Sequence, residues 1–284
     1  MRRRYLIIFT VIITAAILAA VWWWRRPERV VTAAVVKLAD AKTQRFTADL
    51  TIANSGAAQQ VLGQPATVVM RLNGAFARRE SERDALTADV ELVTETEGIT
   101  LRVEGTTRFI GDKAYVHITT APATFPLLAQ LKDQWIELPR GGQSNDNSAA
   151  SGDELFSTVD RGSRTKIAGD WVTVYNANAT GQAVIRLLDG IADVLGTRLT
   201  AEQIDGIRQA VAADAAVPVE VWATPWTHEL RRLSASLPVP NQTTISFVLT
   251  LAERNQAQDI AVPANAQTLE GIVAGLQSSP SPAP

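Results

Sequence analysis

The sequence predicts an α+β protein: an N-terminal transmembrane helix, then one mostly antiparallel β domain whose apolar face is covered by helices. Three observations support this fold class. Residues 5–24 contain no charged side chain. Most of the chain beyond residue 45 alternates apolar and polar residues with the period of a strand. Between Gln182 and Ala213 the apolar residues recur with the period of a helix instead.

The N-terminal stretch reads YLIIFTVIITAAILAAVWWW, which is long enough to cross the hydrocarbon core of a bilayer. Tyr5 begins this predicted anchor, and Trp22, Trp23 and Trp24 end it where an aromatic belt meets the lipid headgroups. A cleaved signal peptide is the alternative, but its apolar region is usually shorter, about 7–15 residues, and small residues follow it. Tryptophans and arginines occupy that place here, which favours a retained anchor.

Basic residues flank the anchor on both sides. Arg2, Arg3 and Arg4, together with the α-amine, favour a cytoplasmic N-terminus. We therefore expect a single-pass protein of the cell membrane. Residues 1–26 would be the anchor, residues 27–276 an extracytoplasmic domain, and residues 277–284 a disordered tail rich in Ser and Pro.

The domain opens with a predicted helix from Pro27 to Thr43, since proline suits a first turn and apolar residues follow at helical spacing. The predicted strands after it are residues 46–52, 68–72, 86–92, 101–103, 108–118, 135–138, 165–177, 217–223, 228–237, 244–253 and, last, Asp259–Val262. Gly111 begins a hairpin turn within residues 108–118. Residues 140–153 read as a polar surface loop, and a short helix is expected at residues 269–276.

The predicted helices at residues 182–213 carry an apolar stripe that includes Leu188 and Ile191. Thr200 and Gln203 form a capping box at the start of the second of them. Strands with one apolar and one polar face belong to antiparallel sheets that are wet on one side. The apolar face of such a sheet needs a cover, and the helices at 28–43 and 182–213 are the candidates.

The composition excludes several functions. The net charge is −2 and the basic residues are scattered, so a nucleic-acid binder is not expected. Cysteine is absent, which removes disulfides, thiolate metal sites and cysteine nucleophiles. His117 and His228 have neither a second histidine nor a carboxylate at metal-ligand spacing, so no metal or cofactor is expected. No hydrolase, phosphate-binding or metalloprotease motif occurs, and we expect a protein that is not an enzyme.

Four tryptophans follow the anchor. Trp135, Trp171 and Trp222 lie within predicted strands, where packing in the core is the simpler interpretation and lining a ligand space the other. Trp226 lies in ATPWTHE, which predicts an exposed position in a turn.

Five segments in order resemble the LolA/LppX-like superfamily, in particular lipoproteins of the LppX/LprG type. They are FTADLTI after an amphipathic helix, FIGDKAYVHI with DQWIELP, KIAGDWVTVYNANAT, VEVWATPWTHELRRL, and ISFVLTLAERNQAQDIAVPANAQTLEGIV. The likeness runs from about residue 27 to residue 276. It implies a curved antiparallel half-barrel whose concave apolar side is covered by helices and, in relatives, encloses acyl chains or the lipid of a lipoprotein. This chain lacks the lipid-modified cysteine of such lipoproteins and carries the predicted anchor instead, so it would hold a ligand at the membrane rather than shuttle between membranes.

These inferences combine into one hypothesis and one alternative. The hypothesis is a membrane-tethered binding protein for an acyl chain, a lipid or a lipid-modified partner, held between the sheet and the helices at 182–213. The residues expected to line the space, from the direction they face, are Leu50, Ile52, Met70, Leu101, Leu188, Ile191, Phe247 and Leu249. The alternative is a structural or interaction module of the cell envelope with a solid core.

Overall fold

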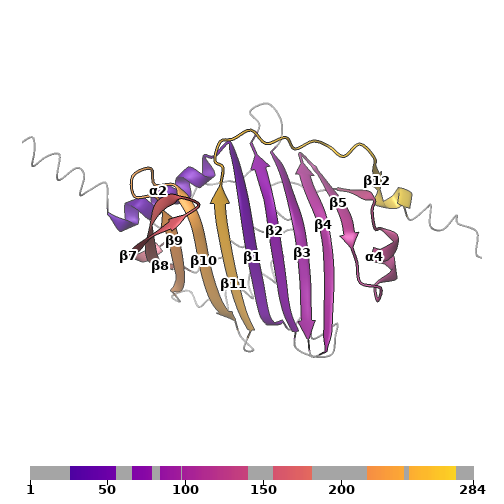
Figure 1. Ribbon diagram of the computed structural model, residues 1–284, viewed down its shortest axis with the longest axis horizontal. Coiled ribbons are helices and arrows are strands. Elements are labelled where there is room, and N and C mark those ends of the chain that lie inside the picture. Colours follow the sequence, from indigo (N-terminus) through magenta and orange to yellow (C-terminus); the bar gives the residue numbers. More distant parts are fainter. Residues whose placement is uncertain are drawn as a thin grey trace, which may run out of the picture.

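The computed structural model describes residues 26–55, 66–78, 84–96, 98–139, 156–180, 216–239 and 243–272. These residues form one twelve-stranded sheet with the strand order β12-β6-β5-β4-β3-β2-β1-β11-β10-β9-β8-β7 (Figure 1). Neighbouring strands are antiparallel, except that β12 runs parallel to β6. The predicted anchor, the predicted loop at 140–153 and the predicted helices at 182–213 lie outside the described residues.

The elements follow the chain in a simple order. They are α2 (Pro27–Ala39), β1 (Thr43–Ser55), β2 (Ala66–Ala77), β3 (Ala85–Thr96), β4 (Ile99–Ile110), β5 (Lys113–Thr120), α4 (Pro126–Gln130), β6 (Trp135–Pro139), β7 (Phe156–Ile167), β8 (Asp170–Ala179), β9 (Val217–Ala223), β10 (Leu230–Val239), β11 (Thr243–Ala252) and β12 (Ala266–Thr268). A helical turn at residues 269–272 follows β12. The alternating segments are therefore confirmed as strands and Gly111 as part of a turn, with exceptions at residues 165–177 and 259–262. Residues 165–177 are not one strand, because the chain turns at Ala168 and Gly169 between β7 and β8.

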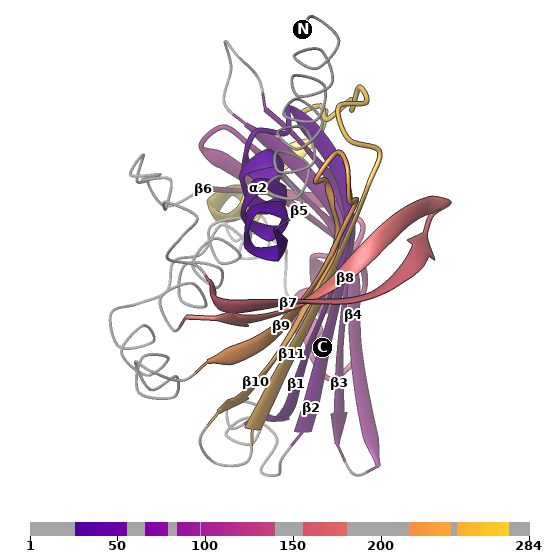
Figure 2. The ribbon, with the colours of Figure 1, turned by 90° about the vertical axis from the view of Figure 1, so that its left-hand side faces the viewer.

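The predicted fold class, an α+β half-barrel with helices over its concave face, is wrong for the described part of the chain. That part is mostly one curved, open sheet, and its helices are α2, with 13 residues, and α4, with five. A helix as short as α2 is about 20 Å long and presents one apolar stripe. It therefore covers only the end of the sheet where it contacts β7, β9 and β10 (Figure 2). No described helix combines the length and apolar character that a membrane crossing requires.

Two boundaries also differ from the prediction. The first helix ends at Ala39 rather than Thr43, because β1 already begins at Thr43. Asp259–Val262 is not a strand. Positive φ angles at Glu253 (50°) and Asn255 (57°) turn the chain out of the sheet after β11. Residues 253–265, the crossing segment, then run past the ends of the central strands to β12 at the far edge (Figure 1).

Two glycines lie where neighbouring strands approach each other closely. A Cβ atom at Gly74 would stand 2.1 Å from the Thr87 carbonyl oxygen, and one at Gly105 would stand 2.3 Å from the His117 carbonyl oxygen. Both positions lie inside strands, where glycine marks a bend or a close backbone approach. Any side chain at these positions would force neighbouring strands apart.

The convex face of the central strands is polar. Glu91 accepts from Arg71 at 2.9 Å and from Arg102 at 2.9 Å, and Arg102 also pairs with Glu104. The Thr120 hydroxyl donates to Glu104 at 2.7 Å, and this hydrogen bond is the main reason that the pKa of Glu104 lies below its ordinary value. These exposed pairs extend over β2, β3, β4 and β5 and mark this face as the one that meets water.

Candidate functional site

The register of the sheet brings six of the predicted lining residues onto its concave face. Leu50 on β1 lies directly opposite Met70 on β2 and Phe247 on β11. Residues paired in this way share a face and stand about 4.5–5.5 Å apart at their Cβ atoms. Leu50, Met70 and Phe247 therefore form one continuous row across three strands.

The other predicted residues continue this face in both directions. Ile52 lies two residues along β1 and opposite Ile245, while Leu249 lies opposite Ala48. Leu101 on β4 is joined to the same face through Thr94 on β3. Leu188 and Ile191 lie outside the described residues and stay predictions. The result is an apolar band, which consists of Leu50, Ile52, Val68, Met70, Leu72, Val90, Leu92, Leu101, Val103, Ile245, Phe247 and Leu249.

The side chains of the apolar band are all half-buried, and none of them is fully removed from water. Single exposed apolar residues are normal on a protein surface, but a contiguous patch over several strands marks a binding site or an interface. The apolar band is therefore the candidate binding surface of the concave face.

The helix α2 covers the same face at the end of the sheet formed by β7 to β10. Val30, Val31 and Ala34 on α2 are at most 1% exposed, and they pack into one apolar cluster with Val221 on β9 and Tyr175 on β8. The apolar stripe of the helix thus meets the apolar face of β7 to β10. Burial of this kind contributes roughly 25 cal/mol for each Å² removed from water.

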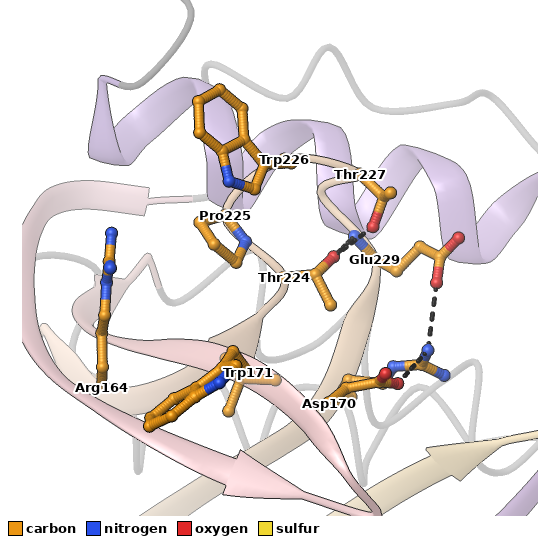
Figure 3. Close-up of a pocket in the computed structure, with 10 residues that line it drawn as sticks. Arg164, Asp170, Trp171, Thr224, Pro225, Trp226, Thr227 and Glu229 are labelled. Carbon is orange, nitrogen blue, oxygen red and sulfur yellow. Dashed lines mark hydrogen bonds and ion pairs between the residues drawn. The ribbon is translucent and has the colours of Figure 1, made fainter.

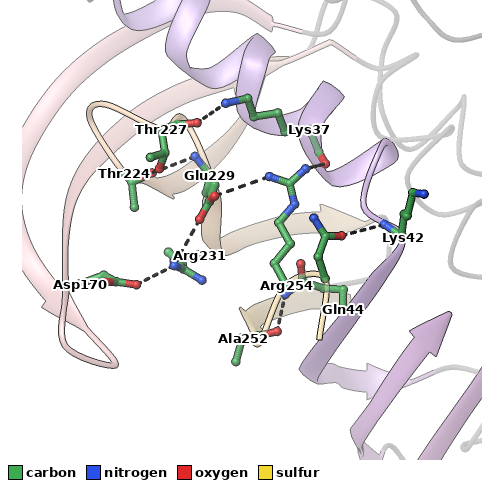
Figure 4. Close-up of polar contacts among 11 residues, drawn as sticks. Lys37, Lys42, Gln44, Asp170, Thr224, Thr227, Glu229, Arg231, Ala252 and Arg254 are labelled. Atoms are coloured by element: carbon green, nitrogen blue, oxygen red, sulfur yellow. Dashed lines mark hydrogen bonds and ion pairs between the residues drawn. The ribbon is translucent and has the colours of Figure 1, made fainter. Parts of the chain in front are cut away.

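Polar contacts fix the C-terminal half of α2 over this end (Figure 4). Arg254 donates from Nη2 to the Lys37 carbonyl oxygen at 2.9 Å, where the helix leaves carbonyl groups without internal partners. The Lys37 ammonium donates to the Thr227 carbonyl oxygen in the β9–β10 turn. Arg254 also lies 3.6 Å from Glu229. Side chains from two distant parts of the chain therefore hold the helix in place.

An acidic pair and one arginine extend these contacts to β8. Arg231 lies 3.3 Å from Glu229 and 2.6 Å from Asp170. The space left between α2, Arg254 and the β9–β10 turn has a volume of about 10 Å³, room for roughly one water molecule. His228, buried in this region, has a pKa below its ordinary value because of burial first and the positive charge of Lys37 second. This end is a packed core.

The described residues contain no group of three His, Cys, Asp or Glu that could hold a metal ion. His117 stacks on Trp135 with ring centroids 5.0 Å apart, and Arg108 lies 4.8 Å from the centroid of the same indole. The two histidines lie in different parts of the sheet, one on β5 and one beneath α2.

No family model matches this chain. No curated protein matches it either. Among solved structures, the chain is similar to the lipoprotein LppX of Mycobacterium tuberculosis, with 15% identity, a TM-score of 0.45, and 82% of this chain and 97% of that chain covered. It is similar to LprF from Mycobacterium bovis at 9% identity and a TM-score of 0.49, with 84% and 97% covered. A putative outer membrane lipoprotein-sorting protein domain from Vibrio parahaemolyticus matches at 9% identity and a TM-score of 0.22, with 81% and 93% covered.

The LolA/LppX-like resemblance is confirmed to this extent: the matched structures include an LppX, an LprF and a lipoprotein-sorting domain.

One groove was missed by the sequence reasoning. It has a volume of about 590 Å³ and is lined by residues of the β7–β8 hairpin and of the β9–β10 turn, among them Trp171 and Trp226 (Figure 3). Trp226 is exposed, as predicted for a turn. Trp171 is 60% exposed, so its interpretation as a core residue is wrong. Gly169, at φ 91°, turns the chain just before it, and a tryptophan directly after a hairpin turn is a signal that could have predicted exposure.

Proposed function

We propose that this protein is a membrane-tethered, extracytoplasmic binding protein whose concave face holds a hydrophobic ligand: an acyl chain, a lipid or a lipid-modified partner. The observation that carries the proposal is the apolar band, a half-buried surface across β1, β2, β3, β4 and β11 with a polar face behind it. A ligand laid on this band would remove apolar area from water, and this burial is the driving force for binding.

The shape of the site supports a long apolar ligand. Paired residues place the band in rows that cross the strands, and α2 closes one end of the same face. An acyl chain can follow such a row without polar partners, which suits a band whose members carry no hydrogen-bonding side chain. Leu188 and Ile191 are proposed as further residues that contact the ligand.

The tether belongs to the proposal on sequence grounds. The uncharged stretch from residue 5 to residue 24 would hold residues 27–276 on the extracytoplasmic side, and residues 277–284 would form a solvated tail. A protein held in this way presents its ligand at one membrane surface. The proposed role is binding without catalysis, because the band offers no titratable group to act as acid, base or nucleophile.

A polarity-sensitive label tests the proposal directly. The chain has no cysteine, so a single Leu50→Cys substitution gives acrylodan one attachment point on the concave face of the full chain in lipid nanodiscs. Thr51→Cys is the matched control, since the adjacent residue of a strand points to the opposite face. Oleic acid should shift the emission of the label at residue 50 to shorter wavelength and leave the label at residue 51 unchanged.

Two results would contradict ligand binding. Equal shifts at residues 50 and 51 would show that oleic acid only partitions into the nanodisc. No shift at either residue, repeated with Met70→Cys, would favour the alternative of an interaction module whose concave face is already filled.

A further inference from the structure

Two exposed indoles share the groove at the end of the sheet that α2 covers. Trp171 is 60% exposed and Trp226 is 62% exposed. They lie on opposite sides of the groove, with Pro225 and Thr224 between them (Figure 3). Trp171 comes from β8 and Trp226 from the β9–β10 turn, so two separate elements bring the indoles together. Large aromatic side chains gathered in this way indicate a contact surface.

The charges around the groove are unequal. The two carboxylates that line it, Asp170 and Glu229, are both paired with Arg231, at 2.6 Å and 3.3 Å. Arg164 also lines the groove and has no carboxylate partner among the described residues. The Lys166 ammonium lies 4.9 Å from the centroid of the Trp171 ring. The rim of the groove therefore combines indoles with surplus positive charge.

Protection of a sheet edge explains part of this arrangement. β7 is an edge strand, and basic side chains on edge strands discourage pairing with another chain. That explanation accounts for Arg164 and Lys166, which lie on β7. It does not account for Trp226, which lies on a turn between β9 and β10, or for the exposure of Trp171 toward the same groove.

The predicted position of the anchor indicates that a membrane is the partner of this groove. α2 begins at Pro27 and contacts β7, β9 and β10, and the predicted transmembrane segment ends at Trp24. Three residues span at most about 11 Å even when fully extended. The start of α2 would therefore lie within about 11 Å of the bilayer, and the groove lies beside the same helix, where Lys37 contacts Thr227. Tryptophan is enriched where proteins meet the headgroup region, and basic side chains are attracted to anionic lipids.

We propose that the groove of Trp171 and Trp226 docks on the membrane that holds the N-terminal helix, with both indoles in the headgroup region and with Arg164 and Lys166 against anionic headgroups. The docking site is separate from the apolar band and depends on the proposed tether. Because β7 and β12 are the two edges of the sheet, docking near β7 would keep the β12 edge away from the bilayer (Figure 1).

Quenching by spin-labelled lipid tests this docking. Ser163→Cys on β7, in the full chain, carries an NBD fluorophore, and the protein is reconstituted in vesicles of phosphatidylcholine and phosphatidylglycerol with doxyl-labelled phosphatidylcholine. Phe125→Cys is the matched control, because Phe125 is an exposed aromatic residue beside α4 in the other half of the sheet. We expect several-fold stronger quenching at residue 163 than at residue 125.

Substitution of the indoles separates docking from mere nearness. Adding Trp171→Ala and Trp226→Ala should lower the quenching at residue 163 by about half or more, since tryptophan provides the interfacial anchoring. Arg164→Gln should have a smaller effect that disappears without phosphatidylglycerol or at high salt. Circular dichroism must show the same β content for the tryptophan variant.

Two outcomes would overturn the docking proposal in a chain whose mass shows that residues 1–26 are present. One is equal quenching at residues 163 and 125, and the other is quenching at residue 163 that the tryptophan substitutions leave unchanged. Either could occur while oleic acid still shifts a label at residue 50, so the failure of docking and the failure of ligand binding are distinguishable.

Discussion

Two regions of one apolar face of this sheet differ in how deeply their side chains are buried. Beneath α2, Val221 on β9 is fully buried, and Tyr175 on β8 is 2% exposed. At the centre of the same face, Leu50 and Met70 remain half-buried. The strands at both places alternate apolar and polar residues alike. The difference follows the position of α2, which among the described helices packs on β7, β9 and β10.

This contrast predicts which substitutions affect stability and which affect the proposed ligand binding. The end under α2 has the packing of a core and the polar contacts of Arg254 and Lys37 to hold its cover in place. The central band has apolar area still available for burial. We therefore expect substitutions under α2 to change the unfolding free energy, and substitutions in the band to change ligand binding more than stability.

The largest difference should come from a matched pair of valines. Val221→Ala creates a cavity in the packed end and should lower the free energy of unfolding by about 2–3 kcal/mol. Val103→Ala, in the half-buried band, removes the same atoms at a site open to solvent and should cost about 1 kcal/mol or less. Urea unfolding of both variants, followed by circular dichroism, measures the two values. Equal losses would show that the band is as tightly packed as the covered end.

A smaller effect is expected at the clamp of α2. Arg254→Met keeps the packing of the side chain but removes its hydrogen bond to the Lys37 carbonyl and its contact with Glu229, and should cost about 1–3 kcal/mol. Arg102→Met, on the exposed convex face, should cost about 1 kcal/mol or less, as surface ion pairs do. Hydrogen exchange of the α2 amides should accelerate in the first variant alone. Unchanged exchange there would show that apolar packing by itself holds the helix.

The smallest effect is a pH dependence centred on His228. Burial lowers the pKa of this imidazole in the folded protein, so the unfolded chain binds a proton more readily. Stability from the neutral form is therefore complete above the ordinary pKa of 6.5 and falls as the pH drops from there toward the folded pKa.

His228→Asn is the control for this effect, because asparagine tolerates the positive φ of 50° at this position. The unfolding free energy, measured between about pH 7 and 5.5, should lose part of its slope in the variant. An identical slope in both proteins would show that other groups account for it.

The sequence predicted local structure well. Alternation predicts that Phe46, Ala48 and Leu50 share one face of a strand, and the register of β1 against β11 confirms this. Gly111 was placed in a hairpin turn and has a φ of 65°. Alternate residues of a strand point to the same face, so a face that is predicted from alternation is correct whenever the strand forms.

Long-range partners were not predictable in the same way. The hydrogen bond between Arg254 and Lys37 joins residues 217 positions apart, and no local pattern encodes it. The prediction that helices cover the concave face was also wrong. Periodicity shows that a face is apolar, but it does not show how much of that face a neighbouring element covers. Asp259–Val262 was predicted as a strand, but positive φ angles at Glu253 and Asn255 direct the crossing segment past the ends of the central strands. Whether the band binds a ligand stays a prediction.

The strand order has a consequence for how the chain reaches its native state. Strands β1 to β6 form one meander and β7 to β11 another, so most pairings join neighbours in sequence. The seam between β1 and β11 instead joins residues 45–53 to residues 244–252. Contacts of such high sequence separation form slowly, because a long loop must close first. One side of β1 therefore stays unpaired until residues 244–252 have been made.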